Sequence, residues 1–197
     1  MTRIWRYVLA ADNGMAPCAQ DGVLTLTCCK PLIRREAAVG DYVMGFLPKR
    51  FGRGRLAYVG RIASRLPLAD YQRRSPDRYD AIYRGVQGPG GQETLEPLRQ
   101  DYHPDMASRH RDASGVHSLR FDPYWYWGGL GVLLPEDLAD MAHYYVGQSA
   151  RGSTPERVEA LQAWLAEMGP PGTWGASREA PKTSVLATPA KARRRSC

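Results

Sequence analysis

The order of apolar and polar side chains predicts a series of short strands in the first part of the chain. Residues 4–10 form an aromatic and apolar run, and residues 22–28 alternate between apolar and polar side chains, as expected for strands of a sheet. The clearest pattern is a hairpin, in which strand 42–47 leads through a basic loop into strand 56–63. We therefore expect a sheet at the centre of the fold.

Two glycines, Gly45 and Gly60, lie inside the strands of this hairpin. Glycine weakens a flat strand but permits a bulge or a sharp bend. The hairpin is therefore expected to curve, as the closure of a small barrel requires.

Short helical segments are predicted next to these strands. Residues 32–38 follow a proline and predict a short helix or turn, with Arg34 and Arg35 pointing to water. Residues 67–74 predict another short helix, which stops before the next proline.

Two helices are predicted near the C-terminal end. Pro135 is followed by two acidic residues, an order favoured at a helix start by the fixed φ of proline and by the helix dipole. Thr154 and Pro155 predict a second helix start. Apolar residues then recur at helical spacing, at Val158, Leu161, Leu165 and Met168.

The segment 85–118 reads as a loop, because it holds eight glycine and proline residues. A loop of this length inside a domain is either functional or disordered. Residues 116–121 then predict a late strand, which leads into the consecutive aromatic residues 124–127.

Composition and charge indicate one globular domain with an uneven charge distribution. Of 197 residues, 43% are hydrophobic and 24% are charged, which is typical of a single folded unit. We expect that unit to span residues 1–175, followed by a flexible, disordered basic tail at 176–197. Residues 30–84 carry 13 basic and 5 acidic side chains, whereas residues 85–175 carry 6 and 12. This asymmetry suits a face for polyanions, and the alternative is a solvated surface with a charged tail.

The cysteines and the lack of long apolar runs indicate a cytoplasmic protein. There are four cysteines, Cys18, Cys28, Cys29 and Cys197, and no CxxC pair, so we expect reduced thiols, no structural zinc and no cofactor. No apolar run is long enough for a membrane span, and the first residues do not form a secretory signal. We therefore expect no membrane partner.

One run of residues carries a family resemblance. Residues 28–46, CCKPLIRREAAVGDYVMGF, resemble the second family of nucleotide modification associated domains. The first strand, the returning strand GRLAYVGRIA and the block YWYWGG support the resemblance, which runs from about Ile4 to about Asp137. Within the segment 85–118, it is carried by Tyr102-His103 and Arg111-Asp112.

The resemblance implies a connection with systems that make or handle modified bases in DNA. The pattern of Gly40-Asp41, strand, loop and strand is also similar to the PUA-like superfamily, which includes the EVE, ASCH and YTH domains. The similarity to this superfamily implies an α+β fold, in which short helices pack around a small curved β-barrel. Several such barrels hold a flipped modified base in an aromatic-lined pocket, which here would open beside the strand that starts at Gly40 and Asp41.

Four consecutive aromatic residues form the expected stacking surface for that base: Tyr124, Trp125, Tyr126 and Trp127. Because a strand alternates its sides, the tryptophans share one face and the tyrosines share the other. We expect one pair to pack inward and the other to face out or line a cleft, where stacking contributes about 1–3 kcal/mol per base. The alternative is core packing with one exposed pair.

Four further residues are candidates to contact the base: Asn13, Cys28, Lys30 and Asp41. Each also has an ordinary structural interpretation. Asn13 and Asp41 suit turns, Cys28 and its neighbour Cys29 suit small buried positions, and Lys30 suits an exposed surface.

Five cations are candidates for phosphate contacts: Arg34, Lys49, Arg50, Arg53 and Arg55. The last four lie with Phe51 in the hairpin loop, where such a group can follow a phosphate backbone or wedge into a duplex. The alternative is a solvated hairpin tip that protects a sheet edge from aggregation.

The leading hypothesis is a binding module for modified nucleotides or bases in nucleic acid, with DNA as the expected polymer. The alternative is an enzyme acting on modified nucleotides, a hydrolase or a transferase, that uses His103, Asp105 and His110. A protein-interaction adaptor is the third possibility. The spacing of the histidines and carboxylates matches no metal motif, so no metal is expected.

Overall fold

The computed structural model describes residues 1–99, 102–103 and 105–179. The expected basic tail beyond residue 179 lies outside the described residues. The strands are β1 (Ile4–Val8), β2 (Cys18–Gln20), β3 (Val23–Leu26), β4 (Tyr42–Phe46), β5 (Arg55–Pro67), β6 (Tyr83–Gln87), β7 (Glu93–Pro97), β8 (His117–Tyr126), β9 (Val132–Leu133), β10 (Gln148–Ser149) and β11 (Gly172–Thr173). The α-helices are α1 (Pro31–Glu36), α2 (Leu68–Arg74), α3 (Met106–Ala113) and α4 (Pro155–Glu167), and the 3₁₀-helices are η1 (Lys49–Phe51), η2 (Gly128–Leu130) and η3 (Glu136–Met141).

A mixed nine-stranded sheet forms the centre of the fold, in the order β10-β1-β4-β5-β8-β3-β2, with β9 paired to β5 and β11 paired to β8. The strands β1 and β4 pair in parallel, and the hairpin of β4 and β5 is antiparallel. The α+β class and the predicted strands of the first part of the chain are confirmed. The closed barrel stays a prediction, because the recorded pairings describe a path rather than a closed ring.

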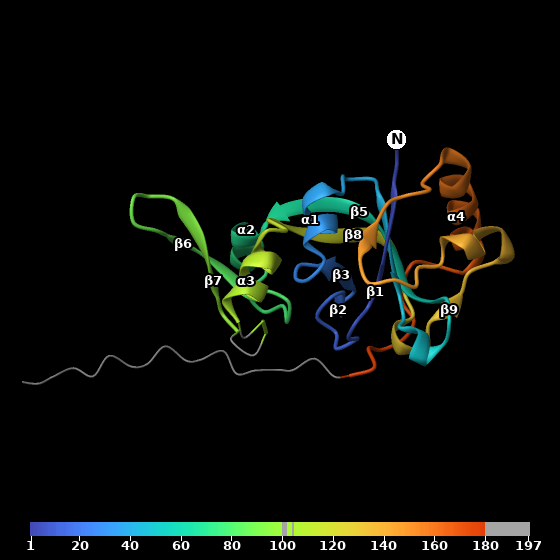
Figure 1. Cartoon of the computed structure of the whole chain (residues 1–197), viewed down its shortest axis with the longest axis horizontal. Helices are drawn as coiled ribbons and strands as arrows, with labels where there is room; N and C mark the ends of the chain where they lie inside the picture. Colours follow the sequence, from blue (N-terminus) through green and yellow to red (C-terminus); the bar gives the residue numbers. More distant parts are fainter. Residues whose placement is uncertain (100–101, 104, 180–197) are drawn as a thin grey trace, which may run out of the picture.

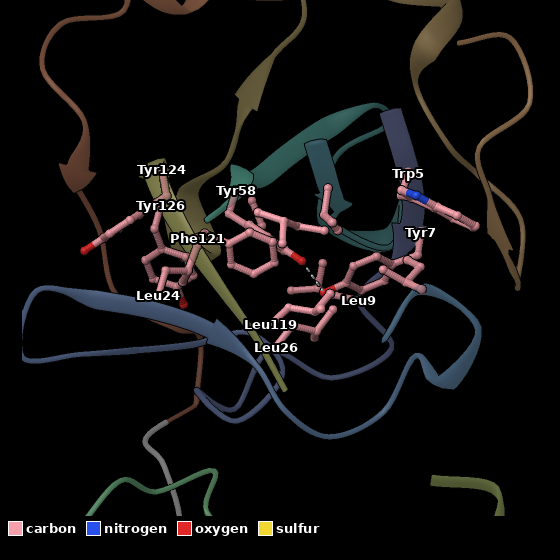
Figure 2. Packing of buried hydrophobic residues seen from close by; sticks show 14 of the residues in the cluster. Trp5, Tyr7, Leu9, Leu24, Leu26, Tyr58, Leu119, Phe121, Tyr124 and Tyr126 are labelled. Carbon is pink, nitrogen blue, oxygen red and sulfur yellow. Dashed lines mark hydrogen bonds between the residues drawn. The ribbon is translucent and has the colours of Figure 1, made fainter. Parts of the chain in front are cut away.

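The sheet curls around an interior of aromatic and aliphatic side chains. Tyr7 from β1, Tyr58 from β5, Phe121 from β8 and Leu24 from β3 lie in one buried cluster, and Figure 2 shows their side chains meeting there. Because β1 and β3 are far apart in the strand order, their side chains meet only if the sheet bends back on itself.

The bend depends on the glycine that the sequence analysis singled out in β4. A Cβ atom at Gly45 would lie 2.6 Å from Leu9 Cδ1, and the Tyr58 ring is still closer. The pairing of β4 with β5 shifts register between Gly45 and Phe46, and the pairing of β5 with β8 shifts after Gly60. The predicted irregularities at both glycines are confirmed.

The opposite face of the sheet is covered by η3 and α4, which Figure 1 shows together on one side of the molecule. Leu161 and Leu165 of α4 pack in a second buried cluster with Trp125 of β8 and Val59 of β5. The predicted start of α4 is confirmed, since Thr154 Oγ1 accepts a hydrogen bond of 3.3 Å from the Arg157 N–H.

The prediction that residues 85–118 form a loop is wrong. The segment contains β7, most of β6, the helix α3 and the first residues of β8. Its glycines between residues 88 and 91 form the tip of the β6–β7 hairpin, which extends away from the main sheet in Figure 1. Asp105 starts α3 by accepting a hydrogen bond of 2.8 Å from the Ser108 N–H. In the part of the chain that the structure describes, no helix is long and apolar enough to cross a membrane.

Candidate functional site

A small hollow lies between the segment that joins β3 to α1, together with the first residue of α1, and one side of α3 with the residue His103 before it. It has a volume of about 190 Å³, and we call it the Cys29 hollow. It is lined by Cys29, Lys30, Pro31, His103, Ser108, Arg111 and Asp112. The fold therefore brings together a thiol, an imidazole, a carboxylate and two cations from segments more than 70 residues apart.

The backbone at one wall of the hollow is in an uncommon conformation. Cys29 and Lys30 have φ values of 57° and 47°, in the left-handed region that non-glycine residues rarely enter. Such strain costs about 1–3 kcal/mol per residue and persists only where the surrounding contacts enforce it. Here the Cys29 carbonyl accepts a hydrogen bond of 2.7 Å from Arg34 Nε, which helps to hold the link in place.

Side chains of alternating charge run from the interior to the hollow. Arg34 has no exposed surface, and its Nη2 lies 2.7 Å from Asp112 Oδ1. Asp112 Oδ2 lies 3.5 Å from His103 Nε2, and the same nitrogen lies 3.9 Å from Cys29 Sγ. Gly115 leaves room for the buried guanidinium, because a Cβ atom there would lie 2.5 Å from Arg34 Cζ.

This arrangement favours a thiolate next to an imidazolium. A hydrogen bond from the Cys28 thiol and another from His103 outweigh burial and lower the pKa of Cys29 to about 5. Asp112 and then Cys29 raise the pKa of His103 to about 10. Burial disfavours the charged form of Asp112, but His103 and Arg34 keep its pKa below the usual value. At neutral pH the pair is therefore ionised, and the thiolate is the reactive form of cysteine.

The chain was compared with models of known protein families. A family model described as nucleotide modification associated domain 2 matches residues 1–181. The chain belongs to this family. The resemblance stated from residues 28–46 is thereby confirmed, and the domain is associated with nucleotide modification systems. No curated protein matches the chain, and neither does any solved structure.

In this nucleotide modification associated domain, one of the three residues predicted as catalytic lines the hollow. His103 lines it, whereas Asp105 caps α3 and His110 is exposed on that helix. From the sequence, His103 and Asp112 were grouped among the histidines and carboxylates, but Cys29 was not grouped with them. The family resemblance was the one sequence signal that could have connected these residues, because it covers Cys29 and the pairs Tyr102-His103 and Arg111-Asp112. Among the residues described, no group of three or more His, Cys, Asp or Glu side chains could hold a metal ion.

The expectation that one pair of the aromatic block faces a cleft needs correction. Tyr124 and Tyr126 pack in the interior of the curled sheet, and Trp125 and Trp127 pack under α4. The predicted alternation is confirmed, but each side has its own core, so all four rings are at most 7% exposed. Tyr124 also borders a hollow of about 530 Å³, where Asp21 and Asp122 supply negative charge that disfavours phosphate.

The other candidate base contacts lie in different places. Lys30 lines the Cys29 hollow, but its Nζ donates a hydrogen bond of 3.1 Å to Val8 O and lies 4.6 Å from the centre of the Tyr7 ring. Cys28 is fully buried beside the hollow.

Asn13 and Asp41 have structural partners. Asn13 Oδ1 accepts a hydrogen bond from the Met15 N–H at 3.3 Å. Asp41 accepts hydrogen bonds from the Ala38 N–H and from Trp5 Nε1, each at 3.0 Å. The interpretation of Asp41 as a cap for the local turn is therefore confirmed.

Arg34 requires a correction among the predicted phosphate contacts. Its side chain was expected to point to water, yet it has no exposed surface. Its guanidinium donates to Cys29 O, His117 O and Asp112. A side chain excluded from solvent cannot reach a phosphate, so Arg34 is part of the internal ion pair.

The four loop cations lie at η1 and the start of β5. Lys49 and Arg53 lie over the ring of Tyr144, 5.7 and 5.0 Å from its centre. Arg50 lies over Phe51, and Arg55 donates hydrogen bonds to the carbonyls of η2 and its end. In Figure 1, β9, which pairs with the start of β5, and α3 lie on opposite sides of the molecule. The loop is therefore remote from the Cys29 hollow.

A second basic surface was missed by the sequence analysis. A groove of about 420 Å³ lies on the face of β3, β8 and β5 that points away from the curled interior, and we call it the arginine groove. It is lined by Val23, Thr25, Ser64, Leu66, Tyr71, Arg74, Ser75, Arg78, Ser118 and Arg120. Strand pairing sets Thr25, Arg120 and Ser64 in one row across the three strands. Arg74 and Arg120 are exposed, and their side chains form no ion pair with any described residue.

The end of the described chain is attached to the N-terminal part. Asp12 accepts hydrogen bonds from the Arg178 and Glu179 N–H groups, at 3.0 and 2.9 Å. Gly129 N donates to Ala176 O at 2.8 Å. Residues 176–179, which the sequence analysis assigned to the tail, thus contact the folded body.

Proposed function

We propose that the domain binds a modified base or nucleotide in nucleic acid, with DNA as the expected polymer, and that the base enters the Cys29 hollow. The observation that carries this proposal is the position of the most family-specific segment. Cys29, Lys30 and Pro31 of the segment that carries the family resemblance form one wall of the hollow, and His103 and Asp112, which lie in the other matching pairs, form the opposite wall.

The lining of the hollow suits a single base. Ser108, Arg111 and Asp112 offer hydrogen-bond donors and acceptors for a base edge, and the His103 ring and Pro31 offer flat surfaces. The volume of about 190 Å³ is smaller than the ~300–1,000 Å³ of pockets for larger ligands. The hollow therefore favours one base or a small substituent on it rather than a dinucleotide.

The arginine groove supports the same proposal through its charge. Arg74 and Arg120 remain available for phosphate, whereas Arg78 is engaged with Asp80 and backbone carbonyls of β2 and β3. Phosphate contacts give affinity without sequence information, and base contacts give discrimination. We therefore expect the groove to set the affinity for the polymer and the hollow to set the preference for a modified base.

Titration of DNA oligonucleotides with and without a modified base, at several salt concentrations, tests this division. Arg120→Ala is expected to weaken binding equally for both oligonucleotides and to reduce the slope of log K against log salt by about 0.9. Ser108→Ala is expected to reduce the preference for the modified oligonucleotide. Arg61→Ala is the matched control, because Arg61 is exposed and lines neither surface. Equally weak binding of both oligonucleotides, without a salt slope, would reject the proposal.

One observation favours the enzyme alternative. Cys29 and His103 share the hollow at 3.9 Å, and their pKa shifts favour the thiolate and the imidazolium. Asp105 and His110 do not line the hollow, so an enzymatic reaction here would depend on Cys29 and His103.

A further inference from the structure

We propose that Cys29 is the nucleophile of an acyl-transfer site, with His103 as its proton donor, and that the substrate is an ester or amide on a nucleotide bound in the hollow. The inference rests on the proposed function for the identity of the carrier. The site itself rests on the geometry of the hollow.

Cys29 is the cysteine that a small electrophile can reach through this hollow. Its side chain is partly exposed and lines the hollow, whereas Cys18 and Cys28 have no exposed surface. Burial raises the pKa of Cys18, and the neighbouring Cys29 followed by burial raises that of Cys28, so both stay as thiols. The two internal thiols therefore differ from Cys29 in access and in ionisation.

The proton donor stands next to the nucleophile. His103 Nε2 lies 3.9 Å from Cys29 Sγ and 3.5 Å from Asp112 Oδ2. Asp112 Oδ2 is buried and accepts no hydrogen bond of ordinary geometry from the described residues. Its interaction with His103 is the first cause of the raised pKa of that imidazole, and Arg34 fixes the carboxylate from behind at 2.7 Å.

The surrounding charges favour an acyl carbon over an alkyl carbon as the point of attack. Attack on a carbonyl places negative charge on its oxygen, which a nearby cation stabilises, and it produces a leaving atom that needs a proton. The hollow offers Arg111 as a cation and His103 as an acid. Alkyl transfer to a thiolate also produces a leaving atom that needs a proton, but it develops no carbonyl oxyanion for Arg111 to stabilise.

The reaction needs only water as a second reactant. The thiolate sulfur forms a bond to the carbonyl carbon, and the C=O π electrons move to the oxygen. The bond from that carbon to the nucleotide oxygen or nitrogen then breaks with its electron pair, and the leaving atom takes the Nε2 proton of His103. Water next adds hydroxide to the thioester carbon and gives its proton to His103, which releases a carboxylic acid and restores the thiolate and imidazolium.

Reaction of the full chain with p-nitrophenyl acetate tests the site. We expect a burst of p-nitrophenolate with one acetyl group on Cys29, located by fragmentation mass spectrometry. Cys29→Ser is expected to abolish the burst, and Cys197→Ser is the control that should leave it unchanged. A burst that persists in Cys29→Ser, or an acetyl group on another residue, would overturn the proposal.

The pH profile separates a proton donor from a merely structural histidine. The wild-type burst rate is expected to rise with pH through about 5, where Cys29 ionises under the influence of Cys28, His103, Asp112 and Lys30. In His103→Gln the rate at neutral pH is expected to fall and its midpoint to rise above 5, because the variant loses one of the hydrogen bonds that lower the pKa of Cys29 while the one from Cys28 remains. Circular dichroism checks that the variants fold. An unshifted midpoint would overturn the role of His103.

Binding and acylation can fail independently. If wild-type protein prefers modified DNA but shows no burst, the acyl-transfer proposal is rejected and the binding proposal is retained. If the burst occurs without any preference for modified DNA, the site is supported and the proposed nucleotide carrier is rejected. If acylated and unacylated nucleosides compete equally for binding while the burst is intact, the acyl substrate on a nucleotide is rejected.

Discussion

Arg34 and Asp112 form an ion pair that solvent does not reach: the two side chains are 0% and 2% exposed, and Nη2 lies 2.7 Å from Oδ1. Burial of a charge is costly unless a partner of opposite charge is present. The pair therefore ties α1 to α3, and so fixes the two walls of the Cys29 hollow relative to each other.

Removal of Arg34 is expected to be strongly destabilising. Arg34→Met leaves the Asp112 carboxylate buried with one partner fewer, which typically lowers the free energy of unfolding by about 3–5 kcal/mol. Arg35→Met is the matched control, because its ion pair with Glu36 is about half exposed on both sides and such pairs contribute about 0–1 kcal/mol. Urea denaturation of both variants measures the difference, and equal effects would contradict the structural role of Arg34.

The Cys29–His103 pair is expected to make stability depend on pH at both ends of the range. Between about pH 5 and 10 the folded pair holds one proton. The unfolded chain holds two protons below about 6.5, one from there to about 9, and none above. Stability should therefore rise from pH 5 to 6.5, stay level to 9, and fall toward 10. Urea unfolding of wild type and His103→Gln across this range checks it, since the fall between pH 9 and 10 comes from the proton on His103 and should be absent in the variant.

A methyl group at Gly45 is expected to disturb the curled interior. Gly45→Ala would press on Leu9 and the Tyr58 ring, and overpacking of this kind costs about 1–3 kcal/mol. In a Tyr58→Leu background, the additional cost of Gly45→Ala should be smaller, because part of the obstructing ring is gone. A double-mutant cycle by urea unfolding measures this coupling. Equal costs in the two backgrounds would show that the ring is not the obstacle.

The hydroxyl groups of Tyr7 and Tyr58 satisfy each other inside the sheet, 3.0 Å apart (Figure 2). Tyr7→Phe leaves the Tyr58 hydroxyl buried without this partner, which is expected to cost about 1–3 kcal/mol. The double variant, with phenylalanine at both positions, is expected to be nearly as stable as wild type, because no buried hydroxyl remains. Thermal unfolding compares the variants, and additive losses would contradict this interpretation.

Local patterns predicted much of the sheet but not the segment before β8. The strand of Tyr7 follows from a local run of aromatic and apolar residues. The bend of the hairpin follows from Gly45 and Gly60, and the start of α4 follows from its capping residue. All three depend only on neighbours in the sequence. The segment 85–118 was misread because its glycines form a hairpin tip, whereas the same residues also occur in long loops.

The candidate site could not be assembled from spacing alone. His103 lies 74 positions from Cys29, and their approach depends on how α3 docks beside α1. The burial of Arg34 also depends on this docking, since Asp112 and Gly115 provide the charge and the space for it. Pairings at such separation follow from tertiary packing, which no local pattern encodes.

The left-handed backbone at Cys29 and Lys30 has an implication for selection. Glycine adopts this conformation without steric conflict, so a protein optimised only for durability would favour glycine at both positions. A cysteine at position 29 costs some of that stability, and Cys29→Gly should therefore remove the thiolate from the hollow and relax the backbone at this link. Lower stability at a functional residue is common, because many functional sites need a strained or flexible backbone.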